Sequence, residues 1–221
     1  GQAGLFAHRL RELGAEVLNC PTIAFTPTPD GPIDQAFSQL ATYQWICFTS
    51  ANGVDYFMAA LEARGLDTRA LASAQLACIG PATARRLKAY GLNADLVPAT
   101  YVAEGLLASM EERGVSGMRI LIPRAAVARD VLPDTLRTLG ADVTDLPVYQ
   151  TVPGEVAEPV KARIESGDFD VVTFTASSTV EHFCRLFSSE CLPELQSRVV
   201  AACIGPITEK TARAAGFRVD V

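Results

Sequence analysis

Short strand-like runs alternate with helically spaced segments along the chain. The predicted strands lie at residues 15–23, 46–48, 76–79, 119–122 and 142–148, and the predicted helices include residues 3–13, 102–113 and 131–139. Apolar residues three and four positions apart, as in Val54, Phe57, Met58 and Leu61, mark one face of a further α-helix. Strands that alternate with helices in this way predict an α/β fold with parallel sheets and helices on both faces.

The pattern contains an internal repeat. Three blocks recur in the same order and at nearly the same spacing, namely LRELGAEV (10–17) as LRTLGADV (136–143), FTSA (48–51) as FTAS (174–177), and ACIGPAT (77–83) as ACIGPIT (202–208). Matched blocks in one order are the signature of a duplicated structural unit. The chain is therefore expected to contain two copies of one α/β unit.

The order of the repeats suggests that one domain is split in the sequence. Residues 33–149 supply enough strands for one complete α/β domain. The second domain then combines residues 1–26 with residues 155–221. Two linkers, near residues 27–32 and 150–154, would join the domains, and both stretches are rich in proline and polar residues.

The pattern alone leaves a tandem division near residue 125 open. The register of the repeat places the partner of strand 119–122 before residue 1. It places the partner of helix 102–113 beyond residue 221. We therefore expect the discontinuous domain to lack its first strand and its last helix.

Composition and charge argue against several classes of protein. Hydrophobic residues make up 49% of the chain, which fits a globular protein and not a disordered one. The net charge of −6 argues against nucleic acid, which requires a basic surface, but not against a small anion held by local donors. No apolar run reaches the ~18 residues of a membrane span, and the first residues do not resemble a signal peptide. We therefore expect a cytoplasmic protein that does not contact membranes.

Several kinds of chemistry find no support in the sequence. The six cysteines form no CxxC pair, so we interpret them as buried, reduced thiols and expect no metal. The only histidines, His8 and His182, fall in predicted helices and have no match in the other copy. Patterns for zinc proteases, serine hydrolases and phosphate-binding glycine loops are absent. We therefore expect no cofactor and no nucleophilic triad.

Four polar turns that follow predicted strands carry the candidate chemistry. They are Thr49-Ser50-Ala51-Asn52, Gly80-Pro81-Ala82-Thr83, Thr175-Ala176-Ser177-Ser178 and Gly205-Pro206-Ile207-Thr208. Each leads into a helix N-terminus, where free N–H groups and the helix dipole favour anions, at the strand ends where open α/β sheets bind ligands. We therefore predict a polyanionic ligand bound between the two domains. Helix capping alone would explain any single turn, but it explains less well why Gly-Pro-x-Thr recurs in both copies.

Two further residues stand at the ends of predicted strands. Tyr149 matches Ile23 of the other copy, and its phenol could donate a proton or hydrogen bond to a ligand. A half-buried packing tyrosine fits the same position. Arg124 follows strand 119–122, where a guanidinium could bind a carboxylate through two hydrogen bonds. A solvated loop arginine fits that position equally well.

These segments resemble the uroporphyrinogen-III synthases of tetrapyrrole biosynthesis. The matching pieces are LGAEV (13–17) with PTI (21–23), ICFTSANGV (46–54), IGPATA (79–84), VYQT (148–151) and IGPIT (204–208). Each piece is loose alone, but the ordered set spans nearly the whole chain and is fairly specific.

The resemblance implies a fold and a reaction. The fold would have two similar flavodoxin-like lobes with parallel sheets, one lobe discontinuous in sequence, joined by a two-stranded connector. The substrate would be hydroxymethylbilane, a linear tetrapyrrole with many carboxylates. Its cyclisation to uroporphyrinogen III would invert ring D through a spiro intermediate and lose water, without a cofactor. We expect the enzyme to act as a monomer. It could receive its substrate directly from the preceding enzyme of the pathway.

The resemblance also implies roles for residues at the strand ends. Tyr149, Thr83 and Thr208 match the family's tyrosine and turn threonines, and would hydrogen-bond the departing hydroxyl. The residues expected to bind substrate are Thr49, Ser50, Asn52, Gly80, Ala82, Arg124, Thr175, Ser177, Ser178, Gly205 and Ile207. The alternative function is that of a non-catalytic, two-lobed binding protein for a carboxylated small molecule.

Overall fold

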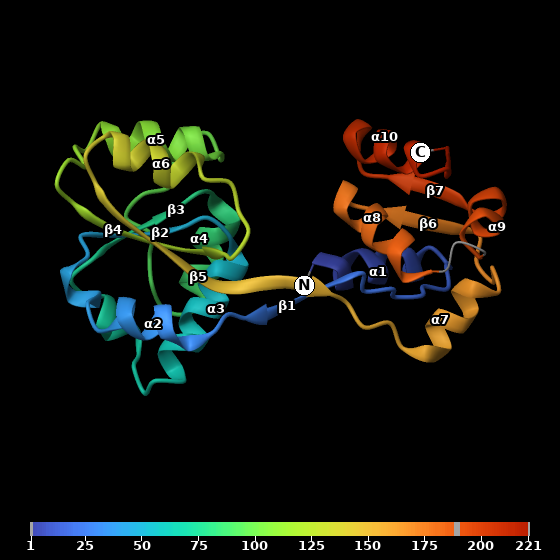
Figure 1. The fold of residues 1–221 in the computed structure, drawn as a ribbon, viewed down its shortest axis with the longest axis horizontal. Coiled ribbons are helices and arrows are strands. Elements are labelled where there is room, and N and C mark those ends of the chain that lie inside the picture. Colours follow the sequence, from blue (N-terminus) through green and yellow to red (C-terminus); the bar gives the residue numbers. More distant parts are fainter. Residues whose placement is uncertain (1, 188–190, 221) are drawn as a thin grey trace. The chain divides into compact units, whose positions relative to one another are not determined.

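The computed structural model describes residues 2–187 and 191–220. The chain forms two compact units, which we call unit 1 (residues 1–24 and 152–221) and unit 2 (residues 25–151). Figure 1 shows helices and parallel strands in both units, which confirms the predicted α/β fold class. Within the described residues, no helix combines the length and the apolar character needed to cross a bilayer.

Both boundaries between the units fall inside strands. One lies in β1 (Ile23–Pro27) and the other in β5 (Asp142–Pro153), and these two strands are neighbours in one sheet. The segments expected to be linkers therefore have regular structure. Residues 27–32 cover the end of β1 and the beginning of the next helix, and residues 150–154 cover the end of β5 and the glycine after it.

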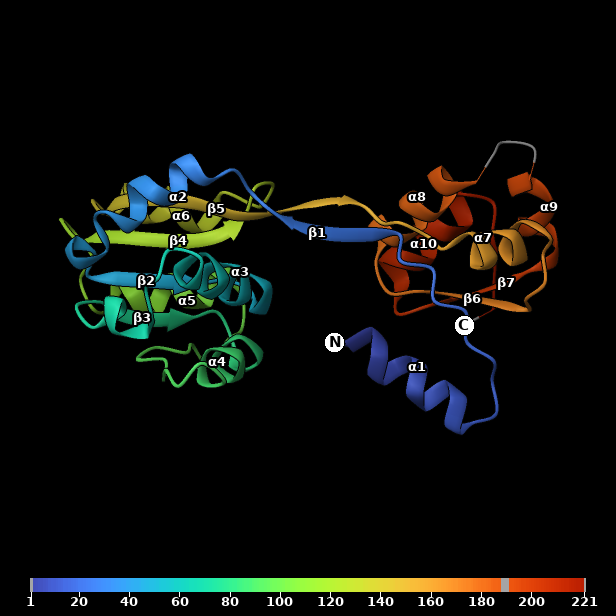
Figure 2. The ribbon, with the colours of Figure 1, turned by 90° about the horizontal axis from the view of Figure 1, so that it is seen from below.

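Unit 2 is built on a sheet with the strand order β1-β5-β4-β2-β3. The other strands of this sheet are β2 (Trp45–Phe48), β3 (Gln75–Cys78) and β4 (Arg119–Ala125). The pairs β2–β3, β2–β4 and β4–β5 are parallel. Figure 2 views unit 2 across these strands, which lie in this order beside one another. Parallel neighbours bring the carboxyl ends of β2, β3, β4 and β5 to the same edge of the sheet.

Helices cover both faces of the unit 2 sheet (Figure 1). One face packs against α2 (Asp30–Phe37), α3 (Ala51–Glu62) and α4 (Pro81–Lys88), and the other packs against α5 (Ala103–Glu111) and α6 (Val131–Thr138). Two short 3-10 helices, η1 (Leu40–Thr42) and η2 (Thr68–Leu71), complete the unit.

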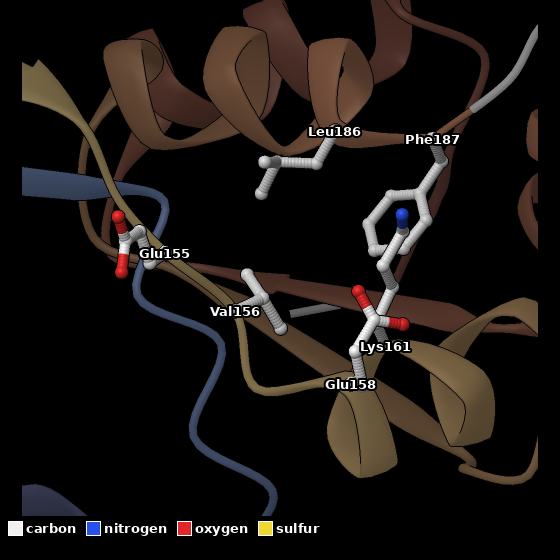
Figure 3. A pocket seen from close by; sticks show the side chains of 6 residues that line it. All are labelled: Glu155, Val156, Glu158, Lys161, Leu186 and Phe187. Atoms are coloured by element: carbon white, nitrogen blue, oxygen red, sulfur yellow. The ribbon is translucent and has the colours of Figure 1, made fainter.

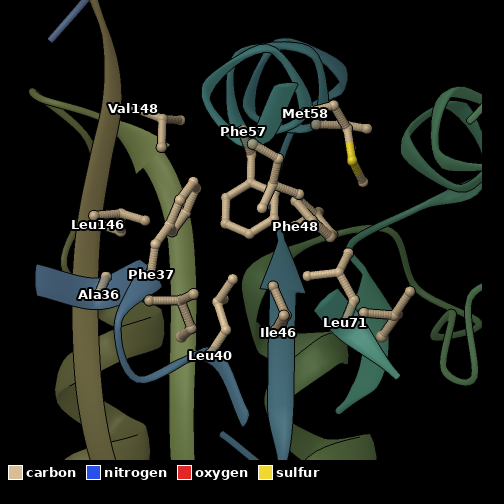
Figure 4. Close-up of a cluster of buried hydrophobic side chains, with 14 of the residues drawn as sticks. Ala36, Phe37, Leu40, Ile46, Phe48, Phe57, Met58, Leu71, Leu146 and Val148 are labelled. Carbon is tan, nitrogen blue, oxygen red and sulfur yellow. The ribbon is translucent and has the colours of Figure 1, made fainter. Parts of the chain in front are cut away.

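The central strand β2 explains how the two faces share the core. Successive side chains of a strand point to opposite faces. Ile46 therefore joins the cluster under α2 and α3, and Trp45 joins the cluster under α5 and α6. In the first cluster the rings of Phe37 and Phe48 both meet Phe57 edge to face, at centroid distances of 5.1 and 5.5 Å (Figure 4). Burial on both faces accounts for the unbroken apolar run that predicted this strand.

Unit 1 has a smaller parallel sheet with the order β6-β7-β8. Its strands are β6 (Val171–Phe174), β7 (Val200–Cys203) and β8 (Arg218–Val219). Its helices are α1 (Gln2–Glu12), α7 (Glu158–Glu165), α8 (Ser177–Leu186), α9 (Cys191–Arg198) and α10 (Pro206–Ala214). The core of this unit gathers Phe174, Phe183 and Phe217, whose rings contact one another edge to face.

Matched turns in the two units support the internal repeat. Gly14 and Gly140 follow the matched helices α1 and α6, with φ angles of 89° and 87°. Gly91 and Gly216 follow the matched helices α4 and α10, with φ angles of 80° and 94°. Only glycine adopts this left-handed conformation without a steric penalty. The repeat therefore preserves backbone conformation as well as sequence.

The strand predicted over residues 15–23 is wrong for most of its length. Residues 15–22 form no strand, and β1 begins only at Ile23. In unit 2 the matching segment, β5, pairs with β4. No described residue of unit 1 forms a strand that corresponds to β4, so residues 15–22 find no equivalent hydrogen-bonding partner.

The described cysteines are free thiols that differ in burial. Cys47 and Cys78 are fully buried in β2 and β3, whereas Cys20, Cys184 and Cys203 are partly exposed. Burial raises the pKa of Cys78 to about 12, and it raises the pKa of Cys47 even further. The prediction of buried thiols therefore holds for β2 and β3 of unit 2. The side chain of Cys191 lies outside the described residues.

Candidate active site

The turn after β2 combines helix capping with a contact to Tyr149. Ser50 is the N-cap of α3, and its Oγ accepts a hydrogen bond of 2.9 Å from the backbone N–H of Gly53. The same Oγ lies 3.3 Å from the hydroxyl of Tyr149. Capping therefore accounts for only part of the role of Ser50. Two residues predicted from separate parts of the sequence, Ser50 and Tyr149, meet at the carboxyl ends of β2 and β5.

Tyr149 lies in an aromatic cluster. Its side chain is 7% exposed, and its ring stacks on Tyr56 of α3 with centroids 5.2 Å apart and planes inclined by 20°. Phe25 of β1 contacts the same ring edge to face at 5.5 Å. The hydroxyl of Tyr56 donates a hydrogen bond of 2.7 Å to the backbone carbonyl of Phe25. The ring of Tyr149 is therefore held from two sides, and its hydroxyl faces Ser50.

Sequence reasoning did not identify Tyr56 or Phe25. Tyr56 lies next to Phe57 on the predicted helix, and the helical spacing offers no sign that its ring would lie beside a residue 93 positions later (149 − 56). Phe25 lies just before a segment expected to be a linker. The only signal in the sequence for a role of Phe25 was that an aromatic residue lies beside this segment.

The turn after β3 leaves little room for a side chain at its glycine. Gly80 is the N-cap of α4, and a Cβ at this position would lie 3.1 Å from the Cβ of Tyr101. Three residues later, Thr83 is 4% exposed. No described residue forms a hydrogen bond with its hydroxyl. Among the described residues no buried side-chain oxygen lacks a partner, so this hydroxyl is open to solvent. Thr49 and Asn52 of the preceding turn are half-buried, and Ala82 is exposed.

The matching turn of unit 1 has the same arrangement. Gly205 is the N-cap of α10, Pro206 takes the first helical position, and Thr208 is 5% exposed. The hydroxyl of Thr208, like that of Thr83, has no hydrogen-bond partner among the described residues. Beside it, Ile204 and Ile207 are 74% and 79% exposed. Apolar side chains this exposed offer a contact surface that the rest of the unit does not use.

Ser177 links the turn after β6 to the Gly-Pro-x-Thr turn after β7. The hydroxyl of Ser177 in α8 donates to the carbonyl of Ile207 over 3.4 Å and accepts from Thr211 of α10 over 2.8 Å. Ser177 thus joins the beginnings of α8 and α10. The remaining predicted residues of this turn, Thr175 and Ser178, are not fully buried.

Arg124 is buried, and its charge is shared with carboxylates of its own unit. Its side chain is 8% exposed, and it pairs with Asp130 and Asp145, each at 3.0 Å. It also donates a hydrogen bond to the backbone carbonyl of Arg129. These contacts are those of a residue that holds the loop after β4, and they exclude the solvated-loop interpretation. Binding of a substrate carboxylate by Arg124 stays a prediction.

Each unit contains a cavity. The unit 2 cavity, of about 300 Å³, is lined by Arg124, residues 125–128, Asp130, Asp145 and Pro147. The unit 1 cavity, of about 320 Å³, is lined by Glu155, Val156, Glu158, Lys161, Leu186 and Phe187 (Figure 3). Its two glutamates outnumber its one lysine, so it does not suit an anion. None of the residues predicted to bind substrate lines it.

Comparisons with known proteins identify the family. The family model "Uroporphyrinogen-III synthase HemD" matches residues 5–221. The porphyrin biosynthesis protein HemD of Ruminiclostridium josui is 35% identical over 218 residues, which are 98% of this chain and 42% of that protein. The uroporphyrinogen-III synthase of Synechococcus elongatus is 31% identical over 227 residues, which are 100% of this chain and 85% of that protein. The chain thus spans less than half of one relative and most of the other.

Solved structures agree with these relatives. A mutant uroporphyrinogen III synthase from Thermus thermophilus shares 25% identity and a TM-score of 0.60, over 98% of this chain and 88% of that one. Uroporphyrinogen-III synthetase from Helicobacter pylori has a TM-score of 0.61 at 16% identity, over 93% of this chain and 88% of that one, and supports the fold alone. The resemblance seen in the sequence is confirmed. The chain belongs to the uroporphyrinogen-III synthase family, the lyase-type cyclases of tetrapyrrole biosynthesis.

Proposed function

We propose that this chain converts hydroxymethylbilane to uroporphyrinogen III, with inversion of ring D and loss of water. The main support is the duplicated Gly-Pro-x-Thr turn, in which Thr83 and Thr208 are largely buried residues whose hydroxyls form no hydrogen bond with a described residue and are open to solvent. A hydroxyl that is accessible and has no protein partner can donate a hydrogen bond to a ligand. Family membership over residues 5–221 supports hydroxymethylbilane as this ligand.

The chemistry requires little acid–base catalysis from the protein. The pyrrole nitrogen next to the hydroxymethyl group can expel hydroxide with its own electron pair, which leaves an azafulvenium cation. A hydrogen-bond donor near the departing oxygen assists this step. We assign that role to the hydroxyls of Tyr149, Thr83 and Thr208, each of which carries an O–H donor.

The contact between Ser50 and Tyr149 supports the assignment of Tyr149. The Oγ of Ser50 accepts a hydrogen bond from the backbone N–H of Gly53, and its own O–H can donate to the oxygen of Tyr149. The phenolic proton then remains free for a ligand. Hydrogen bonds in such a chain strengthen one another.

Positioning is the larger part of the proposed mechanism. Ring D must react at its substituted carbon, so the enzyme must bend a flexible chain into one geometry before closure. The turn residues Thr49, Asn52, Gly80, Ala82, Thr175, Ser178, Gly205 and Ile207 lie at or beside helix N-termini, whose N–H groups suit carboxylates. We propose that turns of both units bind carboxylates of one substrate molecule.

Isomer analysis tests this function directly. Fresh hydroxymethylbilane is supplied to the purified chain, and the oxidised products are separated into type I and type III isomers. Type I forms without an enzyme, so production of type III supports the proposal. A product mixture equal to that of the enzyme-free reaction would contradict it. A non-catalytic binding protein, the alternative from the sequence, would bind the substrate and yield only type I.

Variants test the assignment of the hydroxyls. We expect Tyr149→Phe, Thr83→Ala and Thr208→Ala each to lower kcat about tenfold, the equivalent of roughly 1.4 kcal/mol in the transition state. Thr138→Ala is the control, because this exposed threonine bonds only to the carbonyl of Asp134 within α6. Unchanged rates in all three site variants would remove the donor role and leave the fold assignment intact.

We also propose that the enzyme acts as a cytoplasmic monomer that receives its substrate from the preceding enzyme of the pathway. The support for this is the family, whose substrate is a small molecule made in the preceding step. Sedimentation of the purified chain across a range of concentrations tests the monomer. A mass that rises toward twice 23.5 kDa would contradict it.

A further inference from the structure

Two exposed cations occupy the same place in the two copies of the Gly-Pro-x-Thr turn. Arg85 follows Thr83 by two residues in α4, and Lys210 follows Thr208 by two residues in α10. Both side chains are exposed, and neither forms an ion pair or hydrogen bond with another described residue. The repeat therefore places a free positive charge beside each buried threonine.

Two other cations on the same helices, Arg86 and Arg213, are paired, whereas Lys88 of α4, like Arg85, is unpaired among the described residues. The guanidinium of Arg86 pairs with Asp55, and that of Arg213 pairs with Glu209 at 2.9 Å. Glu209 is next to Lys210 in the sequence, and its carboxylate is already engaged by Arg213. The chain has 25 acidic residues for 19 Lys and Arg residues, so acidic partners are plentiful. Arg85 and Lys210 nevertheless remain unpaired among the described residues of their units.

Helix geometry directs these charges toward the turns. Side chains of an α-helix lean toward its N-terminus and lie over the residues three and four positions earlier. For Arg85 one of those residues is Ala82, and for Lys210 it is Ile207, and both are exposed. A long cationic side chain spans about one helical turn of ~5.4 Å. Each charge can therefore reach the rim of the turn that precedes it.

We propose that Arg85 and Lys210 bind carboxylates of the substrate, one at each turn, and so determine specificity for a polycarboxylated chain. This inference rests on the proposed function. It explains how a protein with a net charge of −6 attracts a polyanion, since local cations at the binding turns outweigh the distant net charge. The threonine hydroxyl and the turn N–H groups then fix the bound group by hydrogen bonds.

Charge-removing variants with matched controls test the inference. Arg85→Gln and Lys210→Gln remove one charge at the turns, whereas Lys88→Gln and Arg185→Gln remove one exposed charge in the last turns of α4 and α8. We expect each turn variant to raise KM for hydroxymethylbilane about 2- to 5-fold, as an exposed ion pair would, with little change in kcat. The double variant Arg85→Gln with Lys210→Gln should raise KM by about the product of the two effects.

Salt and a second readout separate this inference from a general charge effect. Raising the ionic strength should bring the KM values of wild type and turn variants together, because salt screens exposed charges. Equilibrium binding of uroporphyrin III, followed by its fluorescence, should weaken by the same factors. This measurement needs no turnover, so it tests the inference even if type III product is not formed. Unchanged KM and uroporphyrin binding in Arg85→Gln and Lys210→Gln, or equal losses in the Lys88 and Arg185 controls, would overturn it.

Discussion

Gly105 should resist a substitution that normally stabilises helices. It lies in the first turn of α5, and a Cβ built on it would lie 2.1 Å from the carbonyl oxygen of Thr100. Ordinary contacts of a Cβ begin near 3.4 Å, so Gly105→Ala demands a separation of about 1.3 Å more. The helix cannot move freely, because Leu106 and Met110 are fully buried in the core on this face of the sheet.

Two opposing effects determine the sign and the magnitude of the change in the free energy of unfolding. Replacing glycine by alanine at a compatible helical site stabilises by about 0.4–1 kcal/mol. Forcing extra atoms into a packed region costs about 1–3 kcal/mol. The steric cost exceeds the gain, so we expect Gly105→Ala to lower the free energy of unfolding of unit 2 by roughly 1–2 kcal/mol. Gly31→Ala, in the first turn of α2 with nothing within 4 Å of its built Cβ, should leave that free energy unchanged or raise it.

Trp45 provides a probe that is specific to unit 2. It is the only tryptophan of the chain, it is 2% exposed, and it packs in the same cluster as Leu106 and Met110. Its fluorescence during urea unfolding therefore follows this unit. We expect the midpoint of Gly105→Ala to fall by roughly 0.5–1 M at an unchanged slope. A midpoint at or above that of the wild type, with Gly31→Ala unaffected, would refute the steric argument.

Three further results are expected from single contacts. Tyr56→Leu removes the ring that stacks on Tyr149 and should lower kcat several-fold, whereas Tyr56→Phe keeps the ring and should retain most activity; equal losses in both variants, measured by isomer analysis, would contradict this. Thiol reagents at pH 8 should modify Cys47 and Cys78 only after unfolding, because burial raises their pKa values and keeps them protonated, so modification in the native state would contradict this. As unfolded thiols ionise near about pH 8.5, the free energy of unfolding of unit 2 should fall as the pH rises above that value toward about 12, which urea titrations at several pH values can measure. Arg124→Leu leaves Asp130 without its ion-pair partner and Asp145 with Arg137 alone, and should destabilise unit 2 by about 2 kcal/mol in the same fluorescence assay. A variant as stable as the wild type would show that the ion pairs of Arg124 contribute nothing.

The sequence predicted the features that depend on local chemistry. The buried strand at residues 46–48 and the glycine at position 140 each follow from a local rule, burial on both faces in one case and a left-handed helix end in the other. The repeat added information over long distances, because it required the turn at residues 205–208 to match the turn at residues 80–83. These elements lie where the pattern placed them.

Features that depend on tertiary partners were missed or misjudged. Residues 15–22 match part of β5 through the repeat, but a strand needs a neighbour, and the repeat does not report one. Tyr56 meets Tyr149 only because α3 and β5 are packed in the same unit. Arg124 could be placed at a strand end, but its two carboxylate partners follow from the path of the loop after β4. In each case the deciding contact is set by the fold and not by sequence neighbours.

The split of unit 1 sets an order of events during synthesis on the ribosome. Residues 25–151, which are 127 residues (151 − 25 + 1), must be made after α1 before the rest of unit 1 emerges. At about 5–20 residues per second this interval lasts roughly 6–25 s. Unit 2 is continuous and can collapse within that time. The residues before β1 are therefore made first, but they wait for residues 152–221 before unit 1 can be completed.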